Sequence, residues 1–96
     1  DCLFTAATPT GAPRIGQTSV EIGGVSEDVR LAATRLVRGI NVIGAPALAM
    51  PCGFDAQGMP LGLQIVGRPF QEAQILRVGA ALEDATEFHH RGPAGL

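Results

Sequence analysis

The sequence predicts an α/β fold, because segments with apolar residues at helical spacing alternate with short apolar runs bounded by proline or glycine. The helical segments are residues 26–40 and 71–86, and the two clearest strands are residues 46–51 and 61–66. These strands are expected to pair because the loop between them is short. The strongly apolar second strand is expected to lie in the centre of the sheet. A length of 96 residues allows one domain at most, or part of one.

The N-terminal region is predicted to hold one strand followed by a long loop. Residues 3–7 form a short apolar run that ends at Thr8-Pro9, so the strand is expected to stop at the proline. Residues 11–24 are rich in glycine, proline, threonine and serine, which indicates a loop. Within that loop, residues 19–22 are compatible with a brief strand.

The first helix is predicted to begin at Ser26, whose hydroxyl can accept hydrogen bonds from free backbone N–H groups. Gly39 is expected to end this helix in a left-handed conformation. One apolar face carries Val29, Ala33, Leu36 and Ile40. A second face is mixed in polarity, which is unusual for a surface turned wholly to core or wholly to water. It carries Leu31, Thr34, Arg38 and Asn41.

The last helix, from Gln71 to Thr86, has the clearest apolar pattern. Its packing face is predicted to carry Ile75, Leu76, Gly79 and Leu82, widened by Val78. A glycine in a helix interior costs up to about 1 kcal/mol relative to alanine. The glycine at position 79 therefore indicates a close approach between this helix and a strand.

The composition is apolar for so short a chain, with 46% hydrophobic and 17% charged residues. Such an excess suggests surface that a missing segment of the protein covers. The chain begins at Asp1 without a methionine, and truncation of a longer protein is the explanation that we favour.

Charge and hydropathy argue against two classes of partner. The net charge is −2, and the seven basic residues are scattered arginines without tryptophan or tyrosine beside them, so nucleic-acid binding is not expected. No apolar run approaches the ~20 residues that span a bilayer, so no membrane partner is expected.

The two cysteines, Cys2 and Cys52, lie far apart in the sequence. They indicate reduced thiols in a cytoplasmic protein.

The residues that could carry catalysis do not form a familiar set. Neither Ser19 nor Ser26 lies in a G-x-S-x-G motif. A cysteine nucleophile would pair Cys52 with His89 or His90, but an inert thiol explains Cys52 better. Adjacent histidines point in different directions and lack the spacing of a zinc site. We therefore predict no catalytic residue, no metal ligand and no cofactor in this chain.

Four runs of residues occur in a distinctive order. They are DCLFTAATPTGAPRIG at residues 1–16, TRLVRGIN at 34–41, GAPALAMPCGF at 44–54 and GMPLGLQIVGRPFQEAQILRVGAALE at 58–83. In sequence and spacing they resemble the late part of enzymes of the amidase signature family. The resemblance implies an α/β/α fold in which helices cover both faces of a mixed sheet. Residues 1–96 would be the C-terminal fragment of a single amidase signature domain.

The resemblance also implies an activity. Enzymes of this family cleave carboxamide C–N bonds with a Lys-Ser-Ser catalytic set, which belongs to an earlier part of the family's chain. This chain has no lysine, so none of those residues can be assigned here. The family's helix that matches residues 26–38 lines the acyl pocket. The positions that match its substrate-binding residues are Leu31, Thr34, Val37 and Arg38.

The implied partners are a small-molecule amide and the missing N-terminal portion of the same enzyme, and a homodimer stays open. One alternative is the glutamine amidotransferase branch of the family, whose members form amidated aminoacyl-tRNA. That branch carries aspartate where this chain has Thr34, and simple amidases often carry threonine where it has Val37. Another alternative, from a different class, is a non-catalytic α/β binding module.

Overall fold

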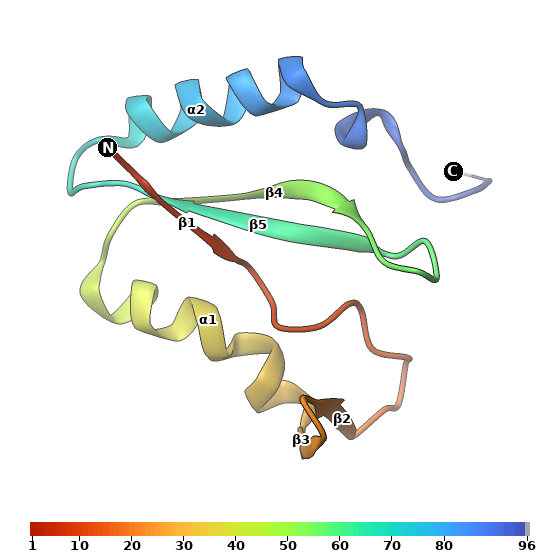
Figure 1. The fold of residues 1–96 in the computed structure, drawn as a ribbon. Helices are drawn as coiled ribbons and strands as arrows, with labels where there is room; N and C mark the ends of the chain where they lie inside the picture. The colour runs from red at the N-terminus through yellow and green to blue at the C-terminus, as the bar shows by residue number, and fades with distance from the viewer. Residues whose placement is uncertain (96) are drawn as a thin grey trace.

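The chain folds into a small sheet with one helix on each face, as a computed structural model of residues 1–95 describes it (Figure 1). The elements are β1 (Leu3–Ala6), β2 (Ser19–Ile22), β3 (Val25–Asp28), α1 (Val29–Ile43), β4 (Ala47–Phe54), β5 (Pro60–Val66), α2 (Glu72–Ala85) and a short 3-10 helix, η1 (Phe88–His90). This arrangement confirms the predicted α/β class. Neither α1 nor α2 has the length and hydropathy needed to cross a membrane.

The main sheet has three strands in the order β1-β5-β4, which confirms the central place predicted for β5. Within residues 1–95 both of its pairings are antiparallel, so any parallel pairing of a mixed sheet lies outside this part. β4 continues past Pro51, where the sequence predicted its end. A bulge between Pro51 and Gly53 adds one residue, and an edge strand tolerates a proline there.

The main core lies between α2 and the sheet. Met50 of β4, Ile65 of β5 and Ile75 of α2 are buried together. A Cβ at Gly79 would collide with the side chain of Leu48 and lie 3.6 Å from Met50 Sδ, so the predicted close approach is confirmed. The expected packing role of Leu76 is wrong, because this residue is 58% exposed.

Both predicted ends of the first helix are wrong. The Gly23-Gly24 turn, with φ angles of 57° and 82°, lets residues 19–22 pair with residues 25–28. Ser26 is therefore drawn into β3, because two glycines with positive φ favour a tight hairpin. Asp28 caps α1 in its place. At the other end the helix passes through Gly39 and stops at Gly44, where φ is 66°.

The cap at Asp28 predicts a pH dependence of stability. Backbone N–H groups of Leu31 and Arg30 donate to Asp28 and hold its pKa below the usual 3.8. The cap therefore contributes its full stability above pH 3.8 and loses it as the pH falls through the lower folded pKa. Urea unfolding of the full-length protein should become less pH-dependent in Asp28→Asn, which keeps an acceptor oxygen without the charge. Identical pH dependence in wild type and variant would refute this role.

Candidate functional site

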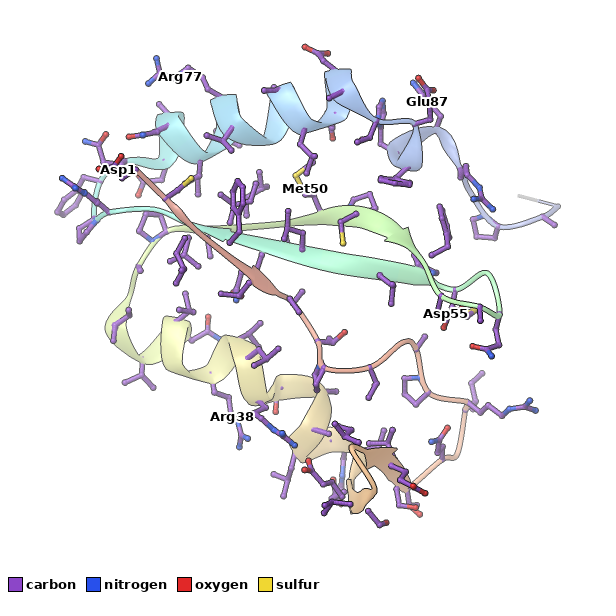
Figure 2. All side chains as sticks on the ribbon, viewed as in Figure 1. Asp1, Arg38, Met50, Asp55, Arg77 and Glu87 are labelled. Atoms are coloured by element: carbon purple, nitrogen blue, oxygen red, sulfur yellow. The ribbon has the colours of Figure 1, made fainter. Side chains whose placement is uncertain are left out.

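The two faces of α1 differ as the periodicity predicted. Val29, Ala33, Leu36 and Ile40 are all half-buried, and Ala32 is buried. The mixed face is exposed, and Figure 2 shows Arg38 on the side of α1 that is turned away from the sheet. The helix therefore presents a surface of mixed polarity that no other element among residues 1–95 covers.

Three of the four residues predicted to bind substrate share this exposed surface. Leu31 is 58% exposed. The Thr34 hydroxyl donates to the Arg30 carbonyl oxygen at 2.9 Å, and Arg38 Nη2 donates to the Leu31 carbonyl oxygen at 3.3 Å. Arg38 takes part in none of the ion pairs within the described chain, so its charge is not neutralised by a carboxylate there. Val37 is half-buried at the border of this surface.

An open groove on the other side of α1 was not predicted from the sequence. It has a volume of about 470 Å³ and lies between α1, the main sheet and the loop that follows β1. Val29 and Ala33 line it from α1, Pro51 from β4, and Leu61 and Gly62 from β5. None of the four predicted substrate residues lines it. Its walls are mostly apolar, and the small side chains on both sides leave the space open.

A smaller pocket of about 290 Å³ lies between η1 and the β4–β5 hairpin. Here the Arg91 guanidinium lies 3.8 Å above the centre of the Phe54 ring, and Phe54 meets the Phe88 ring edge-on at 6.1 Å. These contacts attach the C-terminal segment to the end of the sheet. Contacts between residues so far apart in the chain cannot be predicted from a local sequence pattern.

The candidate nucleophiles and bases are not assembled. Ser19 and Ser26 lie in the β2–β3 hairpin beside α1, whereas His89 and His90 lie in η1 beyond the opposite face of the sheet (Figure 1). Cys52 is half-buried in the bulge of β4, and its thiol is 3.5 Å from the Leu61 carbonyl oxygen. The described residues contain no group of three side chains that could hold a metal ion.

Known proteins match this chain in sequence along its whole length. The Amidase family model matches residues 1–76. A fatty acid amide hydrolase of Oryza sativa subsp. indica is 42% identical over 96 residues, which cover 100% of this chain and 16% of that protein. The glutamyl-tRNA(Gln) amidotransferase of Moorella thermoacetica has a subunit that is 42% identical over 94 residues, which cover 97% of this chain and 18% of that protein.

Solved structures agree with these relatives. A crystal structure of an amidase superimposes with a TM-score of 0.83 at 33% identity, over 88% of this chain and 19% of that one. A chain from work on the evolutionary origins of an s-triazine catabolic enzyme superimposes with a TM-score of 0.84 at 35% identity, with the same coverage of 88% and 19%. The chain thus spans less than a fifth of the proteins that it matches. It belongs to the amidase family.

Proposed function

We propose that residues 1–96 are the C-terminal part of an amidohydrolase that cleaves carboxamide C–N bonds, within a single catalytic domain. One observation carries the proposal: the whole chain aligns at 42% identity with a fatty acid amide hydrolase of which it covers 16%. A free-standing binding module is not expected to align along its whole length with one continuous, small part of an enzyme. The substrate of this protein is proposed only as a small-molecule amide.

The chain also exposes apolar surface that favours a missing portion of the same enzyme as its partner. β1 and β4 are the edge strands of the main sheet within residues 1–95. Leu3 and Phe4 of β1 are 55% and 56% exposed, and Val42 and Ile43 of α1 are 86% and 71% exposed. Large apolar side chains exposed on an edge strand and at a helix end are typical of a surface that another segment covers.

The catalytic groups are proposed to lie in that missing portion as a Lys-Ser-Ser set. A neutral lysine accepts a proton through a bridging serine from the nucleophilic serine, whose oxygen attacks the amide carbonyl. Backbone N–H groups stabilise the oxyanion, the amine leaves with a proton, and water then hydrolyses the acyl-enzyme. Two observations support this location: the chain has no lysine, and its serines are separated from its histidines by the sheet.

The role proposed for this chain is substrate selection by the exposed face of α1. Leu31 offers apolar contact to an acyl group, and Arg38 offers an unneutralised charge about two turns further along the helix. Thr34 lies between them, and Val37 borders the same surface. An apolar surface with one or two polar groups is what a small-molecule site commonly presents.

Enlarging Thr34 is the test of this role. Thr34→Phe in the full-length protein should raise the ratio of kcat/KM for small over bulky amides by at least about tenfold, since a pocket discriminates one methylene by roughly that factor. Thr34→Ser serves as the conservative control, and Arg77→Phe adds the same ring at an exposed position of α2, on the other face of the sheet. An unchanged ratio in Thr34→Phe would remove α1 from substrate selection.

The amidotransferase alternative keeps support from its relative at the same 42% identity. It predicts glutamine-dependent amidation of a charged tRNA, with weak turnover of simple amides. The amidohydrolase hypothesis predicts efficient turnover of simple amides and no amidation of a charged tRNA. Thr34 favours the amidohydrolase hypothesis, because this position has no carboxylate to pair with the ammonium of glutamine. Assaying the full-length protein on both substrates separates the two, and a non-catalytic module would turn over neither.

A further inference from the structure

A buried amide joins α1 to the sheet. Gln64 lies in the central strand β5 with only 4% of its surface exposed, and it is the buried polar residue among those described. Its Nε2 donates to the Thr5 Oγ1 of β1 at 3.1 Å and to the Leu36 carbonyl oxygen of α1 at 3.4 Å. One side chain therefore bridges two strands and a helix.

The direction of these hydrogen bonds is fixed by chemistry. The Leu36 carbonyl oxygen can only accept, so the Gln64 nitrogen must face it. The Thr5 hydroxyl donates to the Ala6 carbonyl oxygen at 3.1 Å, which leaves its lone pairs free for the second Nε2 proton. Both Nε2 protons of Gln64 are thus used, and the bridge has a single consistent arrangement of protons.

This bridge lies where α1 has little other support. The helix is attached to β3 by the Asp28 cap at its N-terminus and by the ion pair between Arg35, near its middle, and Glu27. At its C-terminus the chain leads into β4. The open groove separates Val29 and Ala33 from the sheet on one side. Among residues 1–95, the Gln64 bond is the one side-chain hydrogen bond between α1 and the main sheet.

We propose that Gln64 is a positioning residue that sets the placement of α1, and through it the placement of the substrate-selecting face. Leu36 lies inside the segment 31–38 that carries the four predicted substrate residues, so a shift of α1 at Leu36 moves that face with it. The inference rests on the amide-cleaving function proposed above. Gln64 itself faces the interior and does not act as a substrate ligand.

The test is Gln64→Met in the full-length protein. Methionine has nearly the same length and shape but donates no hydrogen bond. The substitution leaves no partner without a hydrogen bond, because the Leu36 carbonyl oxygen keeps its helical bond and the Thr5 hydroxyl keeps its bond to Ala6.

We expect kcat/KM of Gln64→Met for a good amide to fall between about tenfold and a hundredfold, the effect of misplacing a positioned group. The selectivity between small and bulky amides should change several-fold. The backbone amides of α1 should exchange hydrogen faster than in wild type, whereas those of α2 should exchange as in wild type.

Three further variants serve as controls for this test. Thr5→Val removes one partner of the amide and should give a smaller change of the same kind, whereas Thr5→Ser keeps the hydroxyl and should behave as wild type. Val78→Ala weakens the core on the opposite face of the sheet, and it should lower stability without changing selectivity. Equal selectivity in Gln64→Met and wild type, with only stability reduced, would reduce Gln64 to a structural residue.

The experiment also separates this inference from the proposed function. If the wild-type protein turns over no amide, the amidohydrolase proposal fails. Hydrogen exchange in α1 then decides alone whether Gln64 places the helix. If the wild type is active and the α1 amides of Gln64→Met exchange as in wild type, the positioning role is overturned while the function stands.

Discussion

Ile65→Ala is expected to lower the free energy of unfolding by about 2–5 kcal/mol, the cost of deleting a fully buried aliphatic side chain and leaving a cavity. Ile65 is 0% exposed in the central strand and packs with Met50 and Ile75. β1 and β4 flank β5 on both sides, and α2 lies over this face of the sheet (Figure 1) and contributes Ile75 to the cluster, so the surroundings have little freedom to collapse into the space. Urea unfolding of the full-length protein would measure the change through its midpoint.

Two further variants calibrate this loss. Ile65→Val removes one methylene from the same site and should cost about 0.5–1.5 kcal/mol. Arg77 is exposed on α2 and points away from the sheet (Figure 2), so Arg77→Ala should stay within about 0.5 kcal/mol of wild type. A loss in Ile65→Ala no larger than that in Arg77→Ala would contradict the core between α2 and the sheet.

The sequence predicted those parts of the fold that depend on local patterns. β1 ends before Pro9 and β5 begins at Pro60, each within one residue of the predicted position. The apolar periodicity of α2 predicted its observed bounds to within one residue at each end. The place of β5 in the centre of the sheet followed from its apolar side chains. The close approach at Gly79 followed from the cost of glycine in a helix.

The errors arose where one local signal competed with another. Ser26 is a good helix cap by type, but the Gly23-Gly24 turn placed it in a hairpin and left the cap to Asp28. Gly39 has the type of a helix stop, yet Ile40 and the apolar residues after it continue the helix to Gly44. A propensity at one position gives way when neighbouring residues stabilise the alternative.

The candidate site was predictable only in part. The mixed polarity of one face of α1 followed from the spacing of its residues, and that face is exposed. The Gln64 bridge was not predictable, because it joins residues that lie 59 and 28 positions apart in the sequence. The groove was missed for the same reason, since small residues from the β1 loop, α1 and β5 create it only once the chain has folded.

The second large effect is a complete loss of catalysis in the isolated chain. We expect residues 1–96 alone to release no ammonia from primary amides above background. A serine hydroxyl is a weak nucleophile without a neighbouring base, and Ser19 and Ser26 are separated from both histidines by the sheet. The edge strands β1 and β4 would also lack the segments proposed to cover them, so the isolated chain should associate readily.

Ammonia release from a primary amide, measured for three samples, tests most directly whether the catalytic groups lie outside residues 1–96. These are the full-length protein, residues 1–96 alone, and residues 1–96 expressed together with the preceding portion of the enzyme. We expect turnover by the first and third samples and background release by the second. Turnover by residues 1–96 alone, or none by the full-length protein, would contradict it.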